Sequence, residues 1–124
     1  MSIDPMAAYH SYSQAWSEKS DVDTRANLLA RAWSDDGEFF DPETPGGLVG
    51  RDALIDYIVV THAEIPGLRV TETSEPEILG RRLRVMWAAR QGTQLMFTGT
   101  DFVEFAEDGR VSRLTMFYDS SPQE

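Results

Sequence analysis

The chain has 124 residues, a length that fits one domain, and 41% of its residues are hydrophobic and 10% aromatic, which is enough for a core. Its 11 basic and 21 acidic residues give a formal net charge of −10, which repels phosphate backbones and anionic lipids and so argues against nucleic-acid and membrane partners. There is no cysteine, and the two histidines have no metal-binding spacing, so no disulfide framework and no metal site are expected. The first ten residues, MSIDPMAAYH, do not have a signal-peptide pattern, and we expect a cytoplasmic protein.

Two helices are predicted in the first third of the chain. The first runs from about Pro5 to Glu18, because apolar side chains recur there at helical spacing. The second has Asp23 or Thr24 as its cap, and its apolar face extends to Trp33. The following SDDG is expected to end this helix.

A short strand and a third helix are expected next. The strand is EFF, residues 38–40, and it runs into the turn-rich segment DPETPGG. Gly50 opens a helix that ends before Pro66. The inward stripe of this helix is mostly apolar and consists of Leu54, Tyr57, Ile58 and Thr61.

The second half of the chain alternates with period two and predicts strands joined by short turns. These strands are residues 68–75, 78–90, 93–106 and 110–119. Strands linked in this way form an antiparallel meander. We therefore expect an α+β fold in which three N-terminal helices cover one face of a curved antiparallel sheet, as one domain over residues 1–124 with an ordered core of about 5–119. Such a cone is open at one end, where a ligand can enter.

Asp101 stands out within the predicted strand FTGTDFVEF. Period two places it on the same side as Val103 and Phe105, which look like core residues. Aspartate is rare in strands, and burying its charge without a partner is costly. Asp101 is therefore either a structural acid bonded to Tyr12, Trp87 or a backbone amide, or an acid that faces a pocket.

Four motifs in order resemble the NTF2-like superfamily, and within it the SnoaL-like branch that includes polyketide cyclases and ketosteroid isomerases. The motifs are ARAWSDDGEFFDP, GRDAL, GTDFVEF and DGRVSRL, and the resemblance extends from about Tyr9 to Asp119. It implies a cystatin-like α+β roll. This fold carries enzymes, binding proteins and transport adaptors, so the fold alone does not fix the function.

The resemblance to ketosteroid isomerases implies three catalytic residues. The base of those enzymes stands in a D-P pair, which is Asp41 here, although an aspartate before proline is also common in plain turns. Their protonated acid stands in a late strand, which is Asp101 here. Their tyrosine on the first helix is matched by Tyr12, with Tyr9 as the alternative. In an enolisation the base removes a carbon-bound proton and the two donors stabilise the oxyanion.

The strand and helix patterns also predict the residues that surround a ligand. These residues, which could instead be simple core residues, are Trp16, Trp33, Tyr57, Val85, Trp87, Phe97, Leu114, Met116 and Tyr118. His62 either interacts with the dipole at the end of the third helix or acts as a base at the pocket mouth. Limonene-epoxide hydrolases of the same fold carry an arginine where Gly99 stands, which counts against that reaction unless Arg90 or Arg113 takes its place.

We therefore expect a small cofactor-free enzyme that isomerises or cyclises a small hydrophobic carbonyl or polyketide-like substrate by proton transfer. A non-catalytic binder of a hydrophobic small molecule and an NTF2-like interaction module are the alternatives. The outer sheet face has a mixed character that suits a homodimer interface better than bare solvent. Its predicted residues are Arg84, Met86, Thr98, Thr100, Phe102 and Glu104.

Overall fold

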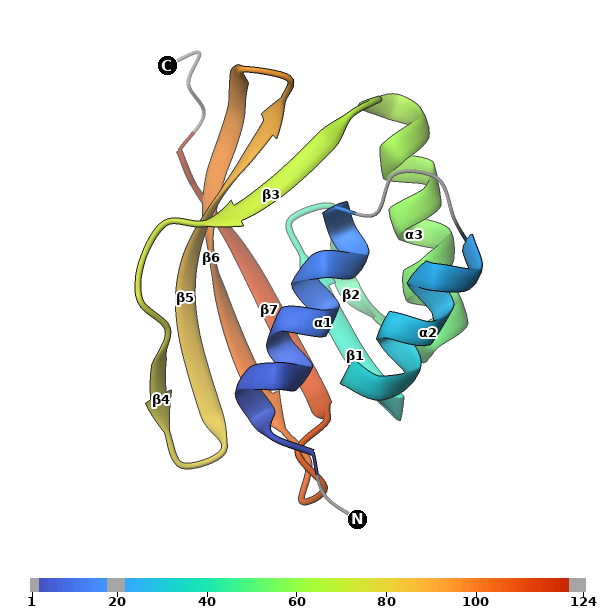
Figure 1. Cartoon of the computed structure of the whole chain (residues 1–124), viewed down its shortest axis with the longest axis vertical. Coiled ribbons are helices and arrows are strands. Elements are labelled where there is room, and N and C mark those ends of the chain that lie inside the picture. Colours follow the sequence, from blue (N-terminus) through green and yellow to red (C-terminus); the bar gives the residue numbers. More distant parts are fainter. Residues whose placement is uncertain (1–2, 18–21, 121–124) are drawn as a thin grey trace.

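The computed structural model of the chain describes residues 3–17 and 22–120 (Figure 1). Its helices are α1 (Pro5–Ser17), α2 (Val22–Ala32) and α3 (Arg51–Glu64). Its strands are β1 (Trp33–Asp41), β2 (Thr44–Val49), β3 (Leu68–Glu72), β4 (Glu77–Leu79), β5 (Arg82–Gln91), β6 (Gln94–Phe105) and β7 (Val111–Ser120). Glu18, the expected end of the first helix, lies outside the described residues.

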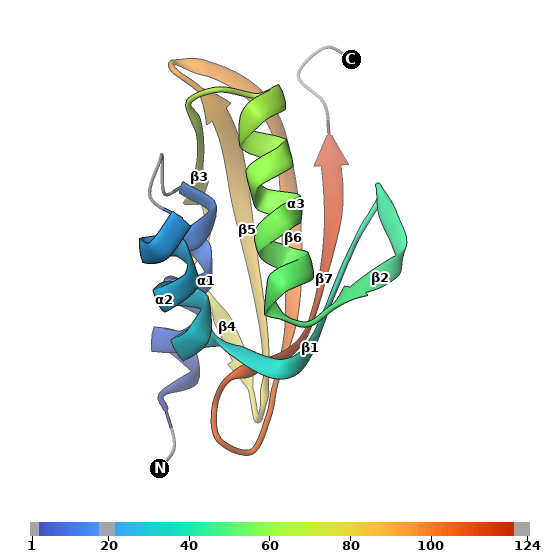
Figure 2. The same ribbon diagram turned by 90° about the vertical axis from the view of Figure 1, so that its right-hand side faces the viewer.

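The strands form one sheet in the order β2-β1-β7-β6-β5-β3, with β4 paired to β5. Strands β3, β5, β6 and β7 are antiparallel neighbours, as the alternating sequence predicts, whereas β1 runs parallel to β7. The long connection between β1 and β7 permits this parallel pairing, so the sheet is mixed. Figures 1 and 2 show the sheet curving around the helices, with α1 and α3 on its concave side. The predicted α+β fold, with three helices on a curved sheet, is confirmed.

The region between α2 and α3 differs from its prediction. Trp33 does not belong to α2, because the helix ends at Ala32 and Trp33 begins β1 as a fully buried residue. SDDG lies inside β1, and the expected turn-rich segment is a tight turn followed by β2. Asp, Gly and Pro have low strand propensity, but β2 is an edge strand, where Pro45 removes no ladder bond that the sheet needs.

One predicted strand is in fact a hairpin. The expected strand over residues 78–90 divides at Gly80 into β4 and β5, and Leu79 pairs with Arg82 across the turn. Gly80 has a φ of +61°, which glycine adopts without the steric cost that other residues meet there. The periodicity on either side of the turn is unbroken, so the alternating pattern alone does not reveal it.

The core lies between the helices and the concave face of the sheet. The inward face of α1 supplies Tyr9, Tyr12 and Trp16, and α3 supplies Leu54 and Ile58. The aromatic side chains of α1 therefore point at the sheet, where Asp101 lies on β6.

None of the helices within residues 3–17 and 22–120 is long and apolar enough to cross a membrane.

Candidate active site

A cavity of about 510 Å³ opens between the concave face of the sheet and helices α1 and α3. The segments that surround its mouth, namely the end of α3, the start of β6 and the end of β7, lie toward the top of Figure 1. Its walls are strongly aromatic, and the rings are those of Tyr9, Tyr12, Trp16, Tyr57, Trp87, Phe97 and Tyr118. A cavity of this size and lining is typical of a small-molecule site.

Asp101 lines this cavity and is only 3% exposed. The hydroxyl of Tyr9 on α1 donates to its Oδ2 at 2.9 Å, and the indole N–H of Trp87 on β5 donates to its Oδ1 at 2.9 Å. Burial raises the pKa of Asp101 to about 7, although both hydrogen bonds act to lower it. Near neutral pH this carboxyl group can therefore be present in its protonated form, which donates a hydrogen bond.

Gly99 makes room for the Trp87 indole. A Cβ atom at this position would lie 2.3 Å from Cζ2 of Trp87 and 2.5 Å from the carbonyl oxygen of Phe117. Any larger residue would displace the ring that donates to Asp101. The space beside Gly99 is thus filled by an indole from the neighbouring strand β5.

The two tyrosines on α1 have different partners. Tyr9 donates to Asp101, whereas the hydroxyl of Tyr12 accepts a hydrogen bond from Nε1 of Trp16 at 2.9 Å. Tyr12 is almost fully buried and lines the cavity, and no described residue accepts its hydroxyl proton. Burial raises the pKa of both phenols, so both remain protonated donors near neutral pH. Tyr9 and Tyr12 are three residues apart and therefore share one face of α1. How deeply each side chain lies against the sheet is set by packing and not by this spacing.

Asp41 lines the same cavity at the end of β1 and is 6% exposed. Its Oδ1 accepts hydrogen bonds from the amides of Glu43 and Thr44 at 3.0 and 2.8 Å and from the Thr44 hydroxyl at 2.8 Å. Its Oδ2 accepts one from the Tyr57 hydroxyl on α3 at 2.6 Å. One oxygen therefore stabilises the β1–β2 turn, and the other keeps a lone pair that no described group occupies.

A family model described as a SnoaL-like domain matches residues 9–114. The chain belongs to the SnoaL-like family. A search of curated proteins found no match.

Solved SnoaL-like and NTF2-like structures share its fold. A candidate isomerase of the SnoaL-like family from Agrobacterium tumefaciens is 24% identical, with a TM-score of 0.84 over 93% of this chain and 97% of that one. A candidate ketosteroid isomerase from Kribbella flavida is 20% identical, with a TM-score of 0.71 over 94% of this chain and 78% of that one. An NTF2-like protein of unknown function from Exiguobacterium is 17% identical, with a TM-score of 0.73 over 92% of this chain and 99% of that one. At these identities the likeness shows the fold alone.

The wall of this SnoaL-like cavity differs in part from the predicted set. Six of the predicted residues line it, namely Trp16, Tyr57, Trp87, Phe97, Met116 and Tyr118. Trp33, Val85 and Leu114 do not, because they are buried in the core, where the helices close directly on the sheet. The alternation of a strand shows which side chains point inward, but not where along the strand the cavity begins.

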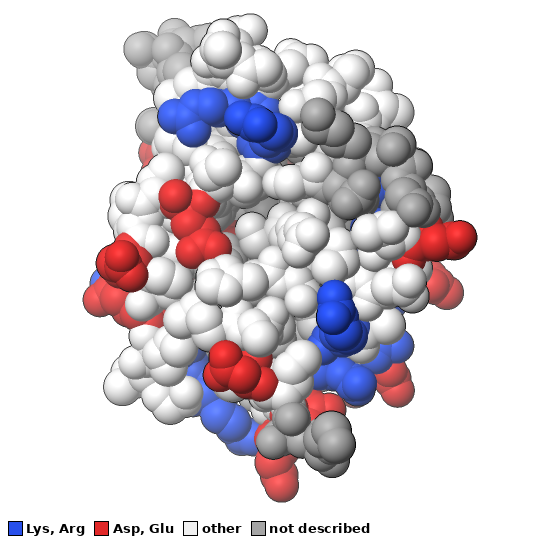
Figure 3. Space-filling model, in the orientation of Figure 1, with Lys and Arg blue, Asp and Glu red and all other residues white. Residues whose placement is uncertain are grey.

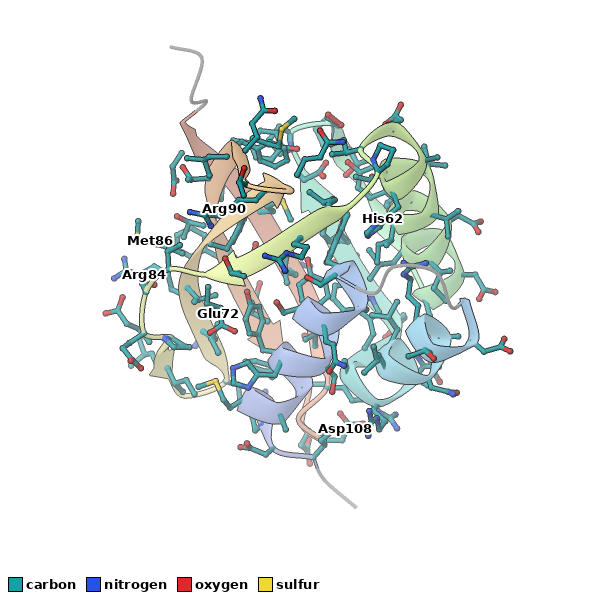
Figure 4. The ribbon with its side chains drawn as sticks, turned by 45° about the horizontal axis from the view of Figure 1, so that its top comes forward. His62, Glu72, Arg84, Met86, Arg90 and Asp108 are labelled. Atoms are coloured by element: carbon teal, nitrogen blue, oxygen red, sulfur yellow. The ribbon has the colours of Figure 1, made fainter. Side chains whose placement is uncertain are left out.

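Neither histidine lines the cavity. Nε2 of His62 donates to the carbonyl oxygen of Trp16 at 2.6 Å and so joins α3 to the last turn of α1 (Figure 4). His10 pairs with Glu72 on β3 at 3.3 Å. Within residues 3–17 and 22–120, no three His, Cys, Asp or Glu side chains are grouped so that they could hold a metal ion.

Proposed function

We propose that this SnoaL-like protein is a cofactor-free enzyme that transfers a proton within a small hydrophobic carbonyl compound. The observation that carries the proposal is the pair of carboxyl groups in one aromatic cavity, of which Asp101 has a pKa raised to about 7. A group with a pKa near the working pH is suited to donate or accept a proton during a reaction. The fold of the candidate ketosteroid isomerase from Kribbella flavida supports the same class of chemistry.

The proposed reaction starts at Asp41. Its Oδ2 takes a proton from the carbon next to the carbonyl group, and the electron pair of that C–H bond moves through the new C=C bond to the carbonyl oxygen. Protonated Asp101 and the Tyr12 hydroxyl donate hydrogen bonds to this oxyanion, while Tyr9 and Trp87 hold the Asp101 carboxyl in place. Each such donor is worth about 3 kcal/mol in the transition state.

The same enolate leads to either of two products. In an isomerase, Asp41 returns the proton to a different carbon of the conjugated system. In an aldol cyclase, the enolate carbon attacks a second carbonyl carbon of the same molecule, and the new alkoxide takes up the proton that Asp41 holds, which restores the Asp41 carboxylate. The apolar walls suit either substrate, because they exclude water from the enolate.

Exchange of substrate protons with deuterated water tests the proposal. A panel of enolisable ketones is incubated with the native protein, with Asp41→Asn and with Asp101→Leu, and loss of the α-proton signal is followed by NMR. The native protein should accelerate exchange for at least one ketone, and both variants should lose the acceleration. No acceleration by the native protein, or full activity in folded Asp41→Asn, would refute the assignment.

A non-catalytic binder of hydrophobic small molecules is the second candidate. The observation that favours it is the engagement of Oδ1 of Asp41, whose three hydrogen bonds serve the β1–β2 turn. In that case ketones and their reduced alcohols should bind with similar affinity in calorimetry, and no exchange should accompany binding. Tighter binding of the ketone together with exchange supports the enzyme instead.

We also propose that the outer sheet face joins two copies of the chain. Met86, Phe102 and Phe117 are exposed there by 48%, 44% and 53%, and the two phenylalanine rings meet edge to face at 5.7 Å. Figure 4 shows Arg84 and Met86 pointing from β5 away from the helices. Light scattering should give a dimer for the native protein and a monomer for Phe102→Glu, while Val60→Glu on α3 remains dimeric. A monomeric native protein would contradict this proposal.

A further inference from the structure

Tyr12 has a buried hydroxyl group whose proton no described residue accepts. The oxygen of this hydroxyl accepts a hydrogen bond from Nε1 of Trp16 at 2.9 Å, and both side chains line the cavity. By contrast, the hydroxyl proton of Tyr9 is donated to Asp101. Tyr12 is only 1% exposed, and a buried donor without an acceptor is costly. The free proton therefore indicates that a ligand in the cavity accepts it.

The hydrogen bond from Trp16 to Tyr12 follows from helix geometry. The two residues are four apart in α1, so they lie one turn apart on the same face. Long side chains in a helix lean toward its N-terminus, which brings the indole of Trp16 over the turn that carries Tyr12. The indole N–H occupies one acceptor position of the Tyr12 oxygen, so the hydroxyl proton must point away from Trp16.

Both rings of this pair are held in place by their neighbours. The ring of Tyr12 stacks on Trp33, with ring centroids 5.3 Å apart and planes at 26°. The indole of Trp16 meets Tyr57 edge to face at 6.0 Å, and its backbone carbonyl oxygen accepts the hydrogen bond from His62 on α3. Packing on both sides therefore sets the distance from Nε1 of Trp16 to the Tyr12 oxygen, as a preorganised donor requires.

The charges that act on the Tyr12 hydroxyl group come from the two cavity acids and not from its own helix. Burial raises the pKa of Tyr12 well above its usual value, and the charges of Asp101 and Asp41 add to the rise, whereas the hydrogen bond from Trp16 acts to lower it. Helix α1 carries no Lys, Arg, Asp or Glu, and Figure 3 shows a mostly uncharged surface at the centre of the view, where α1 lies in Figure 1. No charged group of α1 therefore competes with the indole for the Tyr12 oxygen.

We propose that Trp16 is a positioning residue, which directs the Tyr12 hydroxyl group toward the ligand and strengthens its hydrogen bond to the carbonyl oxygen of the ligand. An indole N–H on the phenol oxygen withdraws electron density from the O–H bond, and hydrogen bonds in such a chain strengthen one another by about 10–30%. The gain is greatest when the carbonyl oxygen becomes an oxyanion, because the bond is then charge-assisted. The inference rests on the proposed function in that the carbonyl end of the ligand lies at Tyr12 and Asp101.

Replacement of a single N–H group isolates this role. The test variant carries β-(3-benzothienyl)alanine in place of Trp16, introduced at an amber codon, so that a sulfur atom replaces the indole N–H in a ring of nearly the same shape. The control variant carries the same replacement at Trp33, whose Nε1 is buried and has no hydrogen-bond partner in the described part of the chain. Tyr12→Phe removes the proposed donor itself and is also combined with the replacement of Trp16.

The first readout is the NMR signal of a bound ketone labelled with carbon-13 at its carbonyl carbon, because stronger hydrogen bonds to the carbonyl oxygen move this signal downfield. The first probe is 4-tert-butylacetophenone, followed by the other ketones of the panel. The replacement of Trp16 should move the signal upfield, part of the way to its position in Tyr12→Phe. The replacement of Trp33 should leave the signal where it is in the native protein.

The second readout is exchange of the α-protons of the same ketone. The replacement of Trp16 should lower kcat by about two- to fivefold with little change in KM, because the oxyanion gains more from the donor than the bound ketone does. In the Tyr12→Phe background the same replacement should have no further effect, because the indole N–H acts only through the Tyr12 hydroxyl group.

A carbonyl signal that is the same with and without the N–H of Trp16 would overturn the inference. So would an equal loss of kcat in the native and Tyr12→Phe backgrounds, because Trp16 would then act by packing alone. If exchange occurs and neither readout depends on the N–H of Trp16, the proposed function stands and the positioning role is wrong. If the carbonyl signal moves as expected without exchange, Trp16 positions Tyr12 in a binding protein and the proposed reaction is wrong. If the native protein binds no ketone of the panel, both proposals fail.

Discussion

Two carboxyl groups line one cavity, yet their surroundings differ in kind. Asp101 lies on a strand among aromatic rings and receives one side-chain hydrogen bond on each oxygen. Asp41 ends a strand at a turn and receives four, two of them from backbone amides. Both are nearly inaccessible to solvent, at 3% and 6% exposure.

The difference shows that burial alone does not assign a role to an acid. At Asp101, loss of solvent outweighs two hydrogen bonds and raises the pKa to about 7, so the group can act as a proton donor. At Asp41, a set of donors directed at the carboxylate holds one oxygen to the turn and leaves the other beside Tyr57. The proposed acid and base thus follow from the donors around each group.

The largest expected effect is on catalysis by Asp101. Asp101→Leu should slow exchange by about 100- to 1,000-fold, because it removes a donor to the oxyanion. Asp101→Asn keeps a neutral donor and should retain more activity. The native rate should fall as pH rises through about 7, since the donating form is lost, and the Asn variant should not show this fall. Rates measured by NMR between pH 6 and 8 check this, and the same pH profile in both proteins would contradict it.

A second prediction concerns stability and pH. The pKa of Asp101 is raised from 3.8 to about 7, so between these values the folded protein holds a proton that the unfolded chain has released. Its contribution to stability is complete below pH 4 and is lost as pH rises to 7. Relative to Asp101→Asn, the native protein should lose up to about 4 kcal/mol over this interval. Urea unfolding at several pH values measures the difference, and a constant difference would count against a buried, uncharged Asp101.

Gly99→Ala should disrupt the Asp101 environment without touching Asp101 itself. The new methyl group would overlap the Trp87 ring, so the indole must move and its bond to Asp101 is lost. Overpacking of this kind costs about 1–3 kcal/mol. The variant should also shift Trp87 fluorescence. Gly46→Ala is the control, because no atom lies within 4 Å of its Cβ position. Equal stability of the two variants would show that Gly99 is not needed for space.

The smallest expected effects on stability come from removing the tyrosine hydroxyl that donates to each acid. Tyr9→Phe should cost about 1–3 kcal/mol and raise the pKa of Asp101 further, because it leaves a buried oxygen without its donor. Tyr57→Phe should cost about 1 kcal/mol, because Asp41 keeps three donors on its other oxygen. Thermal unfolding of both variants gives the comparison. A larger loss of stability for Tyr57→Phe than for Tyr9→Phe would contradict this prediction.

Much of this arrangement can be predicted from sequence, and the exceptions have physical causes. Asp101 is evident because an acid on the inward side of an apolar strand needs a partner. Which of the two tyrosines donates to Asp101 depends on how deeply α1 packs against the sheet, and helical spacing does not determine this depth. In the structure the donor is Tyr9 and not Tyr12. The sequence does not predict strand β2, because its Pro and Gly residues are typical of loops. Pairing at the edge of the sheet overrides that propensity.

Direct titration of the Asp101 carboxyl group shows whether this group is protonated near neutral pH. Carbon-13 labelled aspartate gives one carboxyl signal for each aspartate, and Asp101→Asn identifies the signal of Asp101 by its absence. The midpoint of this signal in the native protein should lie near pH 7. A midpoint near pH 4, the ordinary range of an aspartate in water, would contradict the proposed role of Asp101 as a protonated donor in the cavity.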